Sequence, residues 1–181
     1  LLLCKNGHDV TVWSYKEEEV RTLSEKREHV SKLPGVKIPN EIFFTADLKE
    51  AVEGKDVVVL AVPSIHVRNT AKKMNAYVKG GQILVDVAKG IEEDTLMTLS
   101  QQIEEEIPQA DVAVLSGPSH AEEVGRGLPT TVCIGAHTET TAKYLQQLFM
   151  NEVFRVYISP DILGIELGGS LKNVIALAAG V

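Results

Sequence analysis

The chain has 181 residues, of which 44% are hydrophobic and 24% charged, and its formal net charge is -7. This composition is ordinary for a soluble globular protein and provides for one sizeable core, or for one domain and the start of another. The negative charge argues against nucleic acid or an anionic membrane surface as the main partner, although a local basic pocket for a phosphate remains compatible with it.

The cysteines and histidines show no pattern of a metal or redox site. Cys4 and Cys133 are far apart, and we interpret them as buried reduced thiols of a cytosolic protein without a signal peptide. The histidines lack metal-ligand spacing, so we expect no metal site. They are His8, His29, His66, His120 and His137.

The first part of the chain alternates short elements. β-branched and aromatic residues predict strands, and a charged stretch with a narrow apolar stripe predicts an exposed helix. In chain order we expect the last turns of a helix closed by Gly7, a strand over 9–15, a helix over 16–28, a loop over 31–40, a strand over 42–45 and a helix over 47–52.

The middle of the chain carries apolar runs of strand length. Residues 56–62 read DVVVLAV, without alternation, which is typical of a strand buried on both faces of a parallel sheet. Strand and helix then alternate, which predicts a doubly wound α/β domain with a mainly parallel sheet. The further strands are expected over 82–87, 111–116, 129–134 and 153–158, and the helices over 65–78, 95–107 and 139–150.

A long apolar helix is predicted from Pro160 onward, with Ser159 as its N-cap. Charged residues interrupt it, so we interpret it as a core helix and not as a membrane span. We expect it to begin a second, helical domain, which divides the chain into 1–158 and 159–181. Because the chain lacks an initiator methionine and ends inside this helix, we expect it to be a fragment.

Lys172 lies within the stretch ELGGSLKNVIALAAG at 166–180. An ammonium surrounded by apolar side chains is costly, and desolvation would lower its pKa toward the range that suits proton transfer. The alternative is a lysine at the edge of a packed helix that extends its amine into solvent.

Other candidate groups follow predicted strands, where an open parallel sheet binds its ligands. Lys89 follows the strand at 82–87 and suits an anionic group, with a solvent-facing loop lysine as the alternative. Gly117 to Ser119 offers free backbone N–H groups and a hydroxyl for an anion. The acidic run at 104–106 is interpreted as a solvated helix face.

The dinucleotide fingerprint Gly-x-Gly-x-x-Gly is absent, and its place would be before Leu1. An NAD-selective fold often carries an acidic residue after its second strand. This sequence has Ser14, Tyr15 and Lys16 there, which would not repel a 2′-phosphate and therefore favours NADP(H).

Four motifs together resemble one family. They read AVPS at 61–64, VDVAKGIE around Lys89, LSGPSHAEEVGRGLPT from Leu115 and ELGGSLKNVIALAAG from Glu166. In this order, and over the whole chain, they resemble the bacterial NAD(P)-dependent glycerol-3-phosphate dehydrogenases. The resemblance implies a Rossmann-type domain, preceded by a strand with the glycine-rich loop and followed by a mostly helical substrate domain. The fragment is therefore expected to be inactive by itself.

The resemblance also implies roles for single residues. Lys172 matches the proton donor and acceptor beside the C2 oxygen of the substrate. The positions matching substrate contacts are Lys89, Gly117, Ser119, Lys172 and Asn173. The positions matching contacts to NADP(H) or NAD(H) are Tyr15, Lys16, Lys89 and Ala121.

The implied reaction is the interconversion of dihydroxyacetone phosphate and sn-glycerol 3-phosphate, which feeds glycerophospholipid synthesis in the cytoplasm. The expected partner is this small-molecule substrate, without nucleic acid, and a homodimer is left open. One alternative is a 6-phosphogluconate-type hydroxyacid dehydrogenase, in which an asparagine commonly follows the lysine by four residues; here position 176 is alanine. The other alternative is a non-catalytic binding module.

Overall fold

The main sheet has five strands in the order β5-β6-β7-β8-β9. In the computed structural model, which describes residues 1–180, all neighbours in this sheet are parallel except the antiparallel pair β7 and β8. The predicted mainly parallel sheet is therefore confirmed. The strands are β5 (Val57–Leu60), β6 (Ile83–Asp86), β7 (Asp111–Ser116), β8 (Thr130–Ala136) and β9 (Phe154–Ile158).

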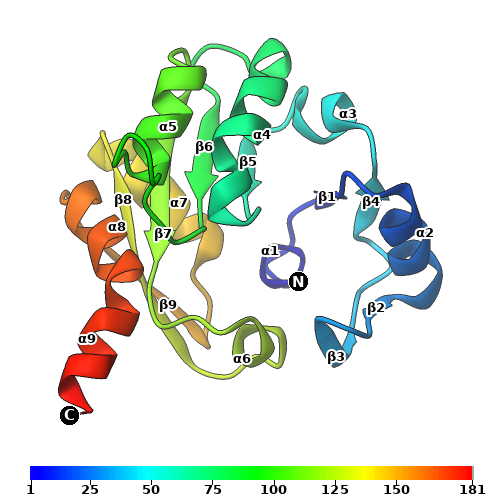
Figure 1. The fold of residues 1–181 in the computed structure, drawn as a ribbon. Helices are drawn as coiled ribbons and strands as arrows, with labels where there is room; N and C mark the ends of the chain where they lie inside the picture. The colour runs from blue at the N-terminus through cyan, green and yellow to red at the C-terminus, as the bar shows by residue number, and fades with distance from the viewer. Residues whose placement is uncertain (181) are drawn as a thin grey trace.

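Helices cover both faces of this sheet, with α4 and α5 in front and α7 behind in Figure 1. Leu84 of β6 packs with α4 and α5, and the next residue, Val85, packs with α7. Both side chains are 0% exposed, which is why the strand sequence shows no alternation. The helices are α4 (Val67–Met74), α5 (Leu99–Glu106) and α7 (Glu139–Phe149).

Two predicted helices have different limits from those expected. The helix predicted over 65–78 is divided into the 3-10 turn η1 (Ser64–His66), α4 and a second 3-10 turn, η2 (Asn75–Tyr77). The helix predicted from residue 95 begins only at Leu99, because Thr98 and Gln101 form a capping box at its start. Residues 91–97 are left as a loop.

A second, smaller sheet pairs β1 (Thr11–Trp13) with β4 (Phe43–Thr45) in parallel. α2 (Glu17–Lys26) packs on it through Leu23, which shares a small core with Phe44. α3 (Leu48–Val52) follows β4, and α1 (Leu2–Lys5) precedes β1. Within residues 1–180, no strand pairing joins this small sheet to the main one.

The loop predicted over 31–40 was wrong. β2 (Glu28–His29) and β3 (Leu33–Lys37) form an antiparallel hairpin there. A carboxylate oxygen of Glu28 accepts a hydrogen bond of 3.0 Å from the N–H of Gly35, whose φ of +78° suits glycine. α6 (Ala121–Gly125) packs on the hairpin and adds a contact that is distant in sequence.

The single C-terminal helix predicted from Pro160 is also corrected. α8 (Ile162–Ser170) and α9 (Lys172–Ala179) are separated at Leu171 by a bend of 54°. Asp161, not Ser159, is the N-cap, because its side chain accepts a hydrogen bond of 2.8 Å from the N–H of Gly164. α9 extends away from the body of the molecule in Figure 1, and all its residues are exposed.

Of the helices in residues 1–180, none is by itself long and apolar enough to cross a membrane. α8 and α9 pass that test of length and composition only when the bent pair is taken together.

The two cysteines predicted as buried are half-buried free thiols.

Candidate active site

Lys89 lies just beyond the carboxyl end of β6. Its Nζ donates a hydrogen bond of 2.8 Å to the backbone oxygen of Gly117, which follows the neighbouring strand β7. Parallel neighbours end at the same edge of a sheet, so the strand order explains why these two predicted residues meet. Lys89 is half-buried and is not a freely solvated loop lysine.

The turn at Gly117 to Ser119 is tighter than expected. The N–H of Ser119 donates to the Gly117 oxygen at 2.8 Å, and the Ser119 hydroxyl lies 3.4 Å from the same oxygen. The predicted free N–H at Ser119 is therefore occupied in this conformation. A Cβ at Gly117 would lie 2.8 Å from the backbone oxygen of Thr131, so only glycine fits at this position.

Glycine also brings α8 against this edge of the sheet. A Cβ on Gly169 would lie 2.6 Å from the hydroxyl of Ser116 and 3.5 Å from Cγ of Lys89. Any side chain there would push α8 away from β7 or displace the lysine stem. The close approach places the start of α9, and with it Lys172, near Lys89.

The two lysines affect each other electrostatically. Burial lowers the pKa of Lys89, and the positive charge of Lys172 lowers it further. The expectation that apolar side chains surround Lys172 was wrong for residues 1–180, because it is the first residue of α9 and is exposed. Asn173 is its exposed neighbour on the same helix.

Two buried acids under the site were missed by sequence reasoning. Glu166 of α8 accepts hydrogen bonds from the N–H and the hydroxyl of Ser100, at 2.9 and 2.6 Å, at the start of α5. Asp86, the last residue of β6, is 0% exposed, and burial raises its pKa to about 7, with the charge of Glu166 as a lesser cause. An acid within an apolar motif was the available signal for both.

The positions expected to contact the adenosine end lie apart from this cluster, beyond β1. Tyr15 is 72% exposed, and the Lys16 ammonium lies 5.3 Å from the centre of its ring. The Ser14 hydroxyl donates to Glu19, and hydrogen bonds from Ser14 and Lys32 lower the pKa of Glu19 to about 2. An ionised carboxylate therefore stands at this strand end, which weakens the sequence argument for NADP(H).

An aromatic face, a cation and a carboxylate fit the adenine, phosphate and ribose of a dinucleotide. Ala121 is the exposed first residue of α6, outside the cluster around the two lysines.

As to metals, the described part of the chain contains no group of three or more His, Cys, Asp or Glu side chains able to hold an ion.

Comparison with known proteins gives one consistent family. Residues 1–142 match the model of the NAD-dependent glycerol-3-phosphate dehydrogenase N-terminus. The chain is 65% identical over 181 residues to a glycerol-3-phosphate dehydrogenase [NAD(P)+] of Agathobacter rectalis, covering 100% of this chain and 54% of the relative. It is 54% identical to the enzyme of the same name from Fusobacterium nucleatum, covering 100% of this chain and 55% of the relative.

Solved structures agree with these matches. The glycerol-3-phosphate dehydrogenase of Coxiella burnetii superposes with a TM-score of 0.92 at 30% identity, covering 99% of this chain and 55% of that one. The Saccharomyces cerevisiae enzyme gives a TM-score of 0.88 at 25% identity, covering 99% and 57%. The chain spans about half the length of the curated relatives it matches. With most of its length matched by the family model, the chain belongs to the NAD-dependent glycerol-3-phosphate dehydrogenase family.

Proposed function

We propose that the intact protein interconverts dihydroxyacetone phosphate and sn-glycerol 3-phosphate with NADP(H) or NAD(H). The reaction would take place in the cytoplasm and feed glycerophospholipid synthesis. The proposal is supported by the family and by the names of the relatives. The observation that carries it is the approach of Lys89 and Lys172 at the carboxyl edge of the sheet, where Lys89 is hydrogen-bonded to Gly117.

In this proposal the two lysines have different roles. The nicotinamide supplies a hydride to the ketone carbon when the cofactor is bound. Lys172 donates a proton to the C2 oxygen as negative charge develops on it, and takes the proton back in the reverse direction. Lys89 contacts substrate and cofactor, and its positive charge offsets the negative charge that develops nearby during the reaction. A charge held in a fixed position stabilises such a transition state strongly.

The remaining candidate residues would position the ligands. We assign substrate contacts to Gly117, Ser119 and Asn173, and a cofactor contact to Ala121. Tyr15 and Lys16 would meet the adenosine end, where the exposed aromatic ring and the ammonium fit adenine and a phosphate. Glu19 offers an acceptor for the ribose hydroxyls, so use of NAD(H) fits this end as well as use of NADP(H).

We further propose that residues 1–158 form the dinucleotide-binding domain and that 159–181 begin the substrate domain. α9 exposes large apolar side chains, with Val174 at 64% and Leu177 at 72% exposure. Such a face calls for a covering surface. The relatives are about twice as long as this chain, so the rest of the protein is our candidate for that cover. A homodimer is the assembly we would test first.

The test is an assay of the full-length protein, in which oxidation of NADPH and NADH is followed by absorbance. Dihydroxyacetone phosphate is compared with the keto forms of small hydroxyacids. Oxidation that requires dihydroxyacetone phosphate supports the proposal. Oxidation of NADPH or NADH with the keto forms of the hydroxyacids alone would favour the 6-phosphogluconate-type hydroxyacid dehydrogenase. No oxidation with any substrate would favour a binding module.

A further inference from the structure

The loop that follows Lys89 is attached to a neighbouring helix by one ion pair. Glu92 is three residues after Lys89 and ends the motif VDVAKGIE. Both of its carboxylate oxygens accept hydrogen bonds from Arg68 of α4, from Nε at 2.7 Å and from Nη2 at 2.7 Å. Two parallel hydrogen bonds between a planar guanidinium and a carboxylate fix orientation as well as distance.

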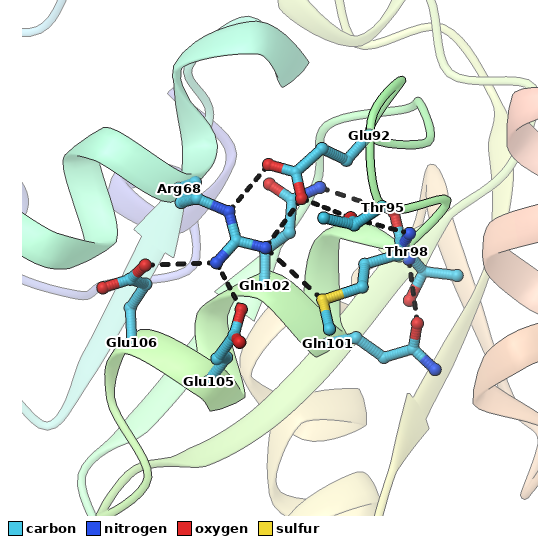
Figure 2. A network of polar contacts seen from close by, with 9 residues as sticks. Arg68, Glu92, Thr95, Thr98, Gln101, Gln102, Glu105 and Glu106 are labelled. Atoms are coloured by element: carbon cyan, nitrogen blue, oxygen red, sulfur yellow. Dashed lines mark hydrogen bonds and ion pairs between the residues drawn. The ribbon is translucent and has the colours of Figure 1, made fainter.

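Arg68 of α4 is also paired with acidic residues of α5. Figure 2 shows it between Glu92 and two acids of α5, Glu105 and Glu106. Its Nη1 donates to Glu106 at 3.1 Å and to Glu105. The acidic run at 104–106 is therefore not only a solvated face, and one guanidinium connects α4, the loop and α5.

The loop is also constrained on its Lys89 side. A Cβ on Gly90 would lie only 2.7 Å from Cβ of Ser64, so the backbone next to Lys89 packs directly on the segment that leads into α4. Further along, the N–H of Glu92 donates to the oxygen of Met97 at 2.9 Å. The loop is thus fastened at Gly90 by packing and at Glu92 by charge.

The position of the Lys89 side chain is limited by the backbone on either side of it. The side chain is long and flexible, and its Nζ hydrogen bond is to a backbone oxygen on a different strand. The direction of the chain at Lys89 and Gly90 therefore decides whether the ammonium reaches Gly117. β6 sets one side of that position, and the loop sets the other.

We propose that the Arg68–Glu92 ion pair is a positioning device for Lys89: it holds the 90–98 loop so that the Lys89 ammonium stays at the Gly117 oxygen. The inference rests on the proposed function for its catalytic consequence. Arg68 and Glu92 are positioning residues that act through Lys89.

The experiment compares three variants of the full-length protein. Glu92→Gln removes the charge on the loop. Arg68→Lys keeps a cation but loses the paired geometry. Glu105→Gln is the matched control, because it removes a partner of the same arginine that lies on α5 and not on the loop. Thermal unfolding of each variant reports any general loss of stability.

Two readouts are measured. The first is the kcat and KM for dihydroxyacetone phosphate, for which we expect about a tenfold loss of kcat/KM in Glu92→Gln and Arg68→Lys, and a change below twofold in Glu105→Gln, since small displacements of positioned groups have large kinetic effects. The second is the acylation of Lys89 by trace acetic anhydride, measured as a function of pH and followed by peptide mass spectrometry. The neutral amine is the species that reacts, and burial lowers the pKa of Lys89. A lysine released from Gly117 into solvent should therefore be labelled with a midpoint at higher pH in the first two variants than in the control.

The two readouts separate this inference from the proposed function. If the wild-type protein reduces no ketose phosphate, the proposed function fails, and the labelling midpoints still decide the positioning role. A labelling midpoint moved to higher pH in Glu92→Gln and Arg68→Lys alone supports the inference. Unchanged labelling overturns it, as does wild-type kcat/KM in Glu92→Gln of an active enzyme.

Discussion

Lys89 and Lys172 are two lysines of one candidate site in opposite surroundings. Lys89 is half-buried, donates to a backbone oxygen and is followed by a loop fastened at two points. Lys172 begins a helix whose residues are all exposed. Residues 1–180 therefore hold Lys89 in a defined position and a half-buried environment. They place Lys172 near it but leave the Lys172 side chain exposed.

The same contrast appears in apolar side chains of similar hydrophobicity. Leu84 and Val85 of β6 are 0% exposed, while Val174 and Leu177 of α9 are 64% and 72% exposed. Burial is a property of the neighbours and not of the residue itself. In the proposed function, the desolvation that would make Lys172 a good proton donor is expected from a surface that covers α9.

The largest effect is expected for Lys172. In the full-length protein, Lys172→Ala should lower kcat by about 10²–10⁴-fold, which is the usual contribution of a general acid. Lys172→Arg should be nearly as slow, because arginine keeps the charge but does not release its proton. Steady-state kinetics at saturating NADPH measure both. A kcat in Lys172→Ala close to that of the wild type would remove Lys172 from the mechanism.

A smaller loss is expected for Lys89. Lys89→Met should lower kcat/KM for dihydroxyacetone phosphate by roughly 10²-fold, because a charge that stabilises the reacting oxygen is removed. Lys73→Met changes an exposed lysine of α4 in the same way and should leave kcat/KM unchanged. Equal kinetics in the two variants would make Lys89 a structural residue.

Asp86, which is buried beneath the site, should make the free energy of unfolding depend on pH. Its pKa is raised from 3.8 to about 7 in the folded protein, so the folded state holds the proton more tightly than the unfolded one. The stability from this group is complete below the unfolded pKa and is lost as pH rises through 7. Asp86→Asn should remove that loss, which is at most roughly 4 kcal/mol.

Urea unfolding at pH 5 and pH 8 measures this effect. The wild type should lose more stability between the two pH values than Asp86→Asn does. Asp56→Asn, which changes an exposed aspartate, should follow the wild type. The same pH dependence in all three proteins would contradict a raised pKa at Asp86.

The smallest effect concerns the cofactor end. Glu19→Gln removes the carboxylate that accepts from Ser14 and that would repel a 2′-phosphate. The ratio of kcat/KM for NADPH to that for NADH should rise by roughly fivefold, equivalent to the net contribution of about 1 kcal/mol that a typical hydrogen bond makes. An unchanged ratio would show that Glu19 does not face the ribose.

Much of the fold was predictable because its signals are local. The strand at 111–116 was predicted to the residue, and the rule that ligands bind at the carboxyl ends of parallel strands indicated both Lys89 and Gly117. The hairpin at 28–37 was missed because Pro34, Gly35 and Pro39 favour a loop by composition, and the sequence does not show the pairing with residues 28 and 29. The break at Leu171 was missed although Gly168, Gly169 and Ser170 precede it, residue types at which helices often kink.

The side-chain contacts that hold the site in place were harder to predict than the site residues themselves. Arg68 and Glu92 are 24 residues apart, and although Glu92 ends the motif VDVAKGIE, nothing in the sequence pairs it with Arg68. Glu166 meets Ser100 across 66 residues. Such pairs arise only when helices pack against one sheet, so the sequence indicates the charges but not their partners.

We propose that Lys89 and Lys172 share one site. The most direct measurement is the titration of Lys89 in the full-length protein by heteronuclear NMR, in the wild type and in Lys172→Ala. We predict that the pKa of Lys89 lies below the ordinary value of 10.5 and rises when the second ammonium is removed. A Lys89 with an ordinary pKa that does not respond to the loss of Lys172 would contradict the claim.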